Sequence, residues 1–111
     1  MKEIAPDIDF ADSSYKSCEM SQGDLIILLN SWNDKTLKIV FSNVIKFIYR
    51  GGSFIAGIYE KTDKSSFLLE ALNSYYENIP KDHPFKVFLI IDIEDIHFFE
   101  IVAEDVLVST E

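Results

Sequence analysis

The sequence contains one cysteine and no long apolar segment. Cys18 cannot form an intrachain disulfide, and we expect it to be a partly buried small side chain rather than a reactive thiol. The apolar runs at residues 25–29 and 87–91 have five residues each, whereas a membrane-spanning helix needs about 20. The N-terminal segment carries Glu3 and Asp7 where a signal peptide has an apolar run. We therefore expect a soluble, cytoplasmic protein with no membrane partner.

Basic residues are absent from residues 87–111, which carry seven acidic side chains. Residues 1–34 carry seven acidic and two basic side chains, whereas residues 35–86 carry five acidic and eight basic ones, and the net charge of the chain is −9. Nucleic acids are bound through clustered Lys and Arg, so this balance argues against a nucleic-acid partner. The acidic segments suit either a basic protein partner or the solubility of a small domain.

Motifs that carry catalytic or cofactor chemistry are also absent. His83 and His97 have no partner at a known metal-ligand spacing, so we interpret them as a loop residue and a strand residue. Residues 50–53, Arg-Gly-Gly-Ser, lack the spacing and the following helix of a phosphate-binding loop. The C-terminal acidic residues lack the central glycine of a calcium loop. We therefore expect no catalytic residue, no cofactor and no metal, and a protein that is not an enzyme.

The length of 111 residues is close to the commonest size of one domain and is sufficient to bury a core without disulfides. Hydrophobic residues make up 48% of the chain, which is typical of a globular protein. Four glycines and three prolines are scattered, so no linker divides the sequence. We expect residues 1–111 to form a single domain.

Apolar patterns predict about seven strands. Residues 25–29 form a continuous apolar run, which is typical of a strand covered on both faces. The pair Asn33-Asp34 tolerates the positive φ of a hairpin turn, and Gly51-Gly52 predicts another hairpin. The other predicted strands are residues 37–42, 45–50, 53–60, 85–91, 97–103 and 106–109. The polar segment 4–22 is expected to add one short edge strand.

A change of period predicts one helix at about residues 66–78. Apolar residues recur there every three or four positions, Asp63, Ser65 and Ser66 are candidate N-caps, and Pro80 ends the pattern. The predicted fold class is α+β, mostly β. A bent antiparallel sheet or partly closed barrel with the helix over one opening or face fits the order of elements, and so does an open meander with the helix on one side.

Acidic turns form the candidate binding site. Asp92, Glu94 and Asp95 surround one predicted turn, and Glu104 and Asp105 lie at another. Hairpin turns project from one rim of a sheet, so these carboxylates could converge into a patch that captures a basic protein.

Trp32 completes the candidate site. It lies beside the predicted turn at Asn33-Asp34 and belongs to the residue type most enriched at binding hot spots. Packing at the margin of the core is the interpretation that the sequence favours for this side chain, and the role of binding anchor is the alternative.

A family resemblance rests on three short segments. They are Leu28-Leu29-Asn30-Ser31-Trp32-Asn33-Asp34-Lys35, the pair Phe41 and Val44, and Glu100-Ile101-Val102-Ala103. With them, residues 24–108 resemble a group of small, single-domain bacterial proteins, some of which are immunity proteins of polymorphic toxin systems. The resemblance implies a small α+β protein that neutralises a toxin by blocking it, and it implies no particular site residues.

The leading hypothesis is therefore a noncatalytic protein-binding module, an immunity-type inhibitor that engages a basic partner through acidic turns. The alternative is a small-ligand carrier or sensor, because nine Phe and five Tyr could line a cavity in a bent sheet. A homo-oligomer is also compatible with the sequence, since the extended edge expected at residues 4–15 could pair with a second copy.

Overall fold

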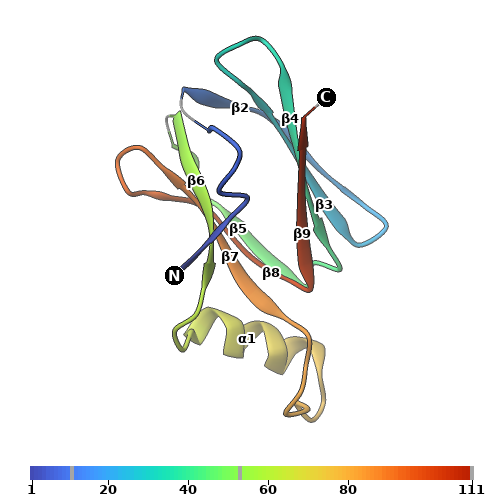
Figure 1. Cartoon of the computed structure of the whole chain (residues 1–111). Helices are drawn as coiled ribbons and strands as arrows, with labels where there is room; N and C mark the ends of the chain where they lie inside the picture. The colour runs from blue at the N-terminus through green and yellow to red at the C-terminus, as the bar shows by residue number, and fades with distance from the viewer. Residues whose placement is uncertain (11, 53, 111) are drawn as a thin grey trace.

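Nine strands and one helix make up the described part of the chain, residues 1–10, 12–52 and 54–110 of the computed structural model (Figure 1). The strands are β1 (Lys2–Ile4), β2 (Ser13–Ser21), β3 (Asp24–Asn30), β4 (Thr36–Ser42), β5 (Lys46–Tyr49), β6 (Phe54–Lys61), β7 (Lys86–Asp92), β8 (His97–Ala103) and β9 (Asp105–Thr110), and the helix is α1 (Ser66–Tyr75). The predicted α+β, mostly β class is confirmed, but the strands number nine rather than about seven. Ser53, the first residue of a predicted strand, lies outside the described residues.

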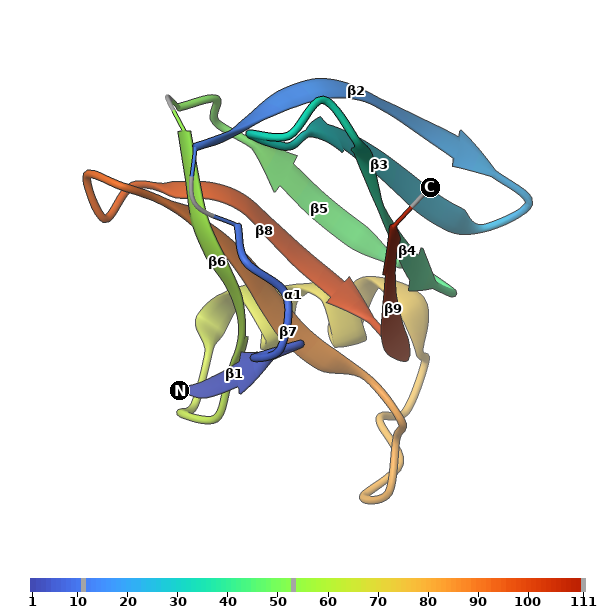
Figure 2. The same ribbon diagram turned by 45° about the horizontal axis from the view of Figure 1, so that its top comes forward.

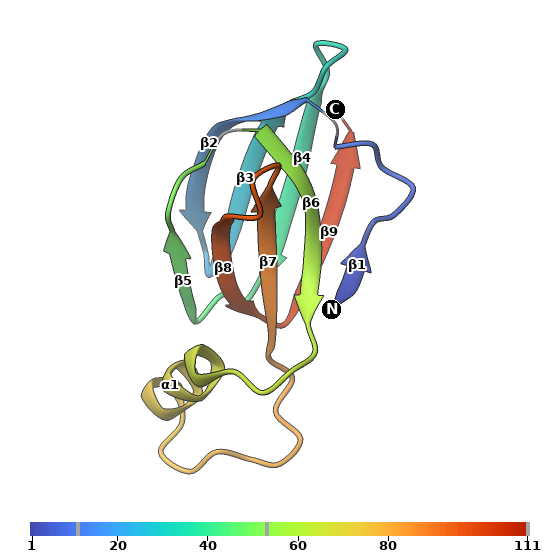
Figure 3. The ribbon, with the colours of Figure 1, turned by 90° about the vertical axis from the view of Figure 1, so that its left-hand side faces the viewer.

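All the strands belong to one antiparallel sheet in the order β5-β8-β7-β6-β2-β3-β4-β9, with β1 paired to β6. Within the described ranges, the end strands β5 and β9 each pair with one neighbour, so the sheet is not closed into a barrel. The sheet bends into two halves. We call β5, β8, β7 and β6 the helical half, because α1 lies beside it, and β2, β3, β4 and β9 the open half (Figures 1 and 3).

The chain passes twice between the halves at one corner. Asn43 has a positive φ of 53° and leads from β4 to β5, and Glu104 leads from β8 to β9. The Glu104 N–H donates to the Ser42 carbonyl at 2.9 Å, and Asn43 Nδ2 donates to Glu104 Oε2 at 2.7 Å. This corner places β5 beside β8 in the helical half rather than beside β4.

The hairpin predicted at Gly51-Gly52 is wrong, because β8 and β7 lie between β5 and β6 in the sheet. Gly52 is required for a different reason. A Cβ atom at Gly52 would lie 2.5 Å from the Phe98 ring and 2.7 Å from Asp92 Oδ2. Any side chain at this position would therefore collide with β8 and with the end of β7.

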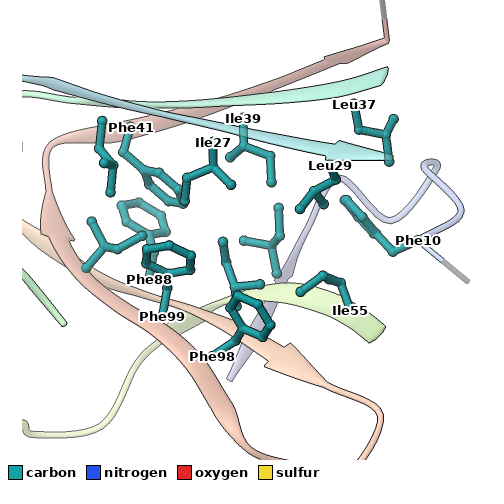
Figure 4. Packing of buried hydrophobic residues seen from close by; sticks show 14 of the residues in the cluster. Phe10, Ile27, Leu29, Leu37, Ile39, Phe41, Ile55, Phe88, Phe98 and Phe99 are labelled. Atoms are coloured by element: carbon teal, nitrogen blue, oxygen red, sulfur yellow. The ribbon is translucent and has the colours of Figure 1, made fainter. Parts of the chain in front are cut away.

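The main core lies between the two halves (Figure 4). On the open half, the side chains of β3 and β4 alternate between core and surface, with Leu25, Ile27, Leu29, Leu37, Ile39 and Phe41 buried. They face buried side chains of the helical half, among them Ile55, Phe88, Phe98 and Phe99. In β4 the alternation in the sequence is therefore the pattern of burial, whereas β3, predicted to be covered on both faces, is buried on one face and only half-buried on the other.

A second hydrophobic cluster joins α1 to the helical half. Phe67, Ala71 and Leu72 of the helix are buried against side chains of β7 and β8. Ser65 caps the helix, with its hydroxyl accepting a hydrogen bond from the Leu68 N–H at 3.2 Å. The helix ends at Tyr75, three residues before the predicted end, because Tyr76 is extended. Within the described ranges, no helix is long and apolar enough to cross a membrane.

The N-terminal segment holds more structure than the one short edge strand expected for residues 4–22. The nine-residue strand β2 lies inside the sheet between β6 and β3 (Figure 2). The polar sequence of β2 does not indicate a position inside the sheet. Only Ser13 is buried, and Tyr15 and Cys18 are half-buried on the core side. The strand β1 is paired to β6, so it is not an unpaired segment.

Candidate protein-binding site

Trp32 is exposed at the tip of the β3–β4 hairpin. The Ser31 N–H donates a hydrogen bond to the Lys35 carbonyl at 2.9 Å. The Ser31 hydroxyl is hydrogen-bonded to the same carbonyl and to Asn33 Oδ1. Asp34 has a positive φ of 62°, so the predicted turn is confirmed. These bonds hold the loop while leaving the Trp32 side chain 62% exposed, so it does not pack at the margin of the core.

A groove of about 260 Å³ lies beside Trp32. The hairpin forms one wall, and Leu37 and Thr110, which are paired between β4 and β9, also line it. Asp7 and Asp9 from the loop between β1 and β2 line it as well. A large aromatic side chain thus stands next to two carboxylates in a recess of the surface.

The same loop also lines a larger groove of about 570 Å³. Its acidic residues are Glu3, Asp7 and Asp9, and its apolar wall includes Ile55 and Ile93. Asp7, Ile8 and Asp9 are common to the two grooves. No described lysine or arginine lines either groove, so we call them together the acidic grooves.

The predicted acidic turn at Asp92 has a different role. The Asp92 side chain is 1% exposed, and its Oδ1 accepts hydrogen bonds from the N–H groups of Glu94 at 2.9 Å and Ile96 at 2.8 Å. It therefore closes the β7–β8 turn and cannot contact a partner. Glu94 and Asp95 remain exposed, next to Ile93, which is 61% exposed and lines the larger groove.

The second predicted acidic turn lies apart from Trp32. Asp105 pairs with Ser42 at one end of the β4–β9 ladder, whereas Leu37, beside Trp32, is at the other end. Five residues of strand separate these ends, a distance of about 17 Å. Glu104 Oε2 accepts a hydrogen bond from the Asn43 side chain, and Asp105 Oδ1 accepts one from the Val106 N–H at 2.8 Å. The six predicted residues therefore do not form one patch.

Asp7 and Asp9, which line both grooves, were not among the predicted site residues. The signal was present as an alternation of acidic and apolar residues at positions 7–10. Phe10 is 5% exposed and Ile8 packs against the main core, whereas Asp7 and Asp9, which alternate with them, are exposed. Ala5, with a positive φ of 53°, turns the loop away from β1, and the sequence gives no sign of this turn.

The chemically reactive side chains lie elsewhere and do not converge. His83 Nδ1 accepts a hydrogen bond from the Phe85 N–H at 3.2 Å, and His97 is exposed at the start of β8. Burial raises the pKa of Tyr15 to about 12, and a hydrogen bond with Cys18 acts in the same direction. The described ranges contain no group of three or more His, Cys, Asp or Glu side chains that could hold a metal ion.

Aromatic side chains fill the interior where a ligand carrier would need a cavity. Phe41 and Phe88 contact each other across the two halves with ring centroids 5.6 Å apart, and Phe98 and Phe99 are 5.7 Å apart. All four are at most 1% exposed. The described interior therefore offers no support for the aromatic-lined cavity of the alternative hypothesis.

Comparisons with known proteins assign no function to this chain, so any assignment has to rest on the site. The chain matches no protein-family model, no curated protein and no solved structure. The resemblance to immunity proteins therefore stays a prediction.

Proposed function

We propose that this chain is a noncatalytic protein-binding module that holds a basic segment of a partner protein in the acidic grooves. The observation that carries the proposal is the pair of grooves around Asp7 and Asp9, in which carboxylates lie beside apolar walls. Glu94 and Asp95 extend the acidic surface from the larger groove, and Trp32 flanks the smaller one. Asp92, Glu104 and Asp105 have no part in this contact.

The groove chemistry suits lysine and arginine side chains. Their aliphatic stems pack on apolar surface while the charged heads stay polar, which matches Ile8 and Ile93 beside the carboxylates. A cation over the face of Trp32 gains further attraction, typically about 0.5–1 kcal/mol at an exposed site. The net charge of −9 would also speed the approach of a basic partner at low salt.

An immunity-type inhibitor is the specific form of the proposal. Such a protein acts by covering a toxin, so it needs a surface for binding and no catalytic residues. The resemblance of residues 24–108 and the acidic grooves are consistent with this role. The basic partner would then be the toxin itself.

A pull-down from the native host's lysate, at low and high salt, tests the proposal. We expect one basic protein to be retained by the wild type at low salt and released at high salt. The double variant Asp7→Asn/Asp9→Asn should lose it. Glu77→Gln/Asp82→Asn removes the same charge from exposed sites outside the grooves and should retain it. Equal retention by both variants would contradict the proposed site.

A further inference from the structure

The outer face of the open half is only partly accounted for by the fold. The continuous apolar run at residues 25–29 is typical of a strand covered on both faces. Leu25, Ile27 and Leu29 point into the core and are 0% exposed, but Ile26 and Leu28 point to the outer face and are half-buried. The sequence thus carries a second apolar face that the described part of the chain covers only partly.

A row of apolar side chains crosses this outer face. Ile26 lies opposite Val40 in the β3–β4 ladder, and Val40 lies opposite Leu107 in the β4–β9 ladder. Leu107 is 69% exposed, more than any other large hydrophobic side chain described. Leu28 lies two residues after Ile26 and points to the same face of β3. We call Ile26, Leu28, Val40 and Leu107 the outer apolar row.

The helical half shows how this protein covers such a face. There, α1 places Phe67, Ala71 and Leu72 on the outer side chains of β7 and β8. Figure 1 shows α1 away from the open half. Among the described residues, neither of the two hydrophobic clusters includes a member of the outer apolar row.

The charged residues around the outer apolar row indicate the charge of the partner that would bind there. Glu19 lies opposite Ile26 at the β2 end of the row. Asp24 and Asp105 stand two residues before Ile26 and Leu107, so they flank the row on one side. Among the charged residues that the strand register places on this face, three are acidic and one is basic, Lys38, which lies opposite Leu28; the exposed Lys16 lies at the register shift of β2. A basic partner complements this rim, whereas a second copy of the face would bring like charges together.

We propose that the outer apolar row is a docking surface for a basic amphipathic helix of a partner protein. The helix would place an apolar stripe on Ile26, Val40 and Leu107, as α1 does on the helical half. Lysines or arginines on its flank would face Asp24 and Asp105. This surface is separate from the acidic grooves and does not depend on them.

A designed peptide tests this proposal without knowledge of the natural partner. The probe is a helix of about 18 residues with leucines at helical spacing on one face and lysines along its flanks. Binding to the whole chain is measured by titration, and the contact is mapped by amide chemical shifts. We expect shifts at Ile26, Val40 and Leu107, and a dissociation constant that rises with salt.

Leu107→Ser should weaken binding of the peptide about tenfold or more, because it removes a leucine that the bound peptide would bury. Leu69→Ser is the matched control on α1, where Leu69 is 54% exposed, and it should leave binding unchanged. A peptide with glutamates in place of the lysines should not bind.

Four results would overturn the proposal. These are no binding of the lysine peptide, equal binding by Leu107→Ser, amide shifts confined to the acidic grooves, and self-association of the free protein that Leu107→Ser abolishes. The last result would show that a second copy covers the face. None of these outcomes contradicts retention of a partner by Asp7 and Asp9, and shifts confined to the acidic grooves would support it, so the two proposals can fail separately.

Discussion

Asp92 holds Ile96 in the β7–β8 turn, with its Oδ1 2.8 Å from the Ile96 nitrogen. The same oxygen accepts a second hydrogen bond from the Glu94 N–H. Since the carboxylate is 1% exposed, water cannot replace it. The charge of this residue therefore serves the fold of the turn that presents Ile93, Glu94 and Asp95.

Replacement of Asp92 should lower the free energy of unfolding. Asp92→Ala leaves both turn N–H groups without their acceptor, and we expect a loss of about 1–3 kcal/mol of unfolding free energy. Asp92→Asn keeps a carbonyl oxygen at the position and should cost less. Urea denaturation of the three proteins measures the difference. A loss below about 0.5 kcal/mol for Asp92→Ala would show that the turn does not need this cap.

Gly52→Ala should be destabilising for a steric reason. The new Cβ would lie 2.5 Å from the Phe98 ring and 2.7 Å from Asp92 Oδ2, and overpacking of this kind costs about 1–3 kcal/mol. Gly23→Ala is the comparison, because Gly23 has a positive φ of 88° with no atom within 4 Å of the added Cβ. Its cost is backbone strain, about 1 kcal/mol. Thermal unfolding that ranks Gly23→Ala as the more damaging change would contradict the close packing at Gly52.

The pair Arg50 and Glu100 should matter more than the other ion pair described, Lys46 with Glu70. Arg50 Nη2 lies 3.2 Å from Glu100 Oε1, and the Glu100 side chain is 11% exposed. Lys46 Nζ lies 3.6 Å from Glu70, whose side chain is 68% exposed. Arg50→Met leaves a buried carboxylate unpaired and should cost about 1–3 kcal/mol, whereas an exposed pair is worth about 0–1 kcal/mol. Equal urea midpoints for Arg50→Met and Lys46→Met would refute this ranking.

Stability should fall between pH 10 and pH 12 as Tyr15 ionises. Burial holds the pKa of Tyr15 at about 12 in the folded protein, above the ordinary value of 10.0. The raised pKa means that the neutral phenol stabilises the fold fully below pH 10, and that this contribution is lost as the pH rises towards 12. Tyr15→Phe has no such proton to lose, so its urea midpoint should fall less steeply over this range. Parallel decline of the two proteins would count against a buried Tyr15 phenol.

The local elements that repeat regularly could be predicted from sequence. The alternation at residues 37–42 matches the burial of β4. The helix start was predicted correctly because Ser65 is a polar cap before an apolar period. These features depend on neighbours within a few residues.

The arrangement of strands could not be predicted, because it depends on contacts distant in sequence. The pairing of β5 with β8 joins residues about 50 positions apart, and it is set by the corner at Asn43 and Glu104. The burial of Asp92 could not be predicted for the same reason. Asp92 resembles any acidic turn residue in the sequence, and only the fold buries it.

The most direct measurement of the acidic-groove proposal uses Trp32, the only tryptophan of the chain. Its fluorescence is followed while an extended lysine- and arginine-rich peptide is titrated at low salt. We expect a saturable change in the emission of wild type and of Glu77→Gln/Asp82→Asn, and none in Asp7→Asn/Asp9→Asn. An unchanged emission in wild type, or an identical response from both double variants, would contradict binding in the acidic grooves.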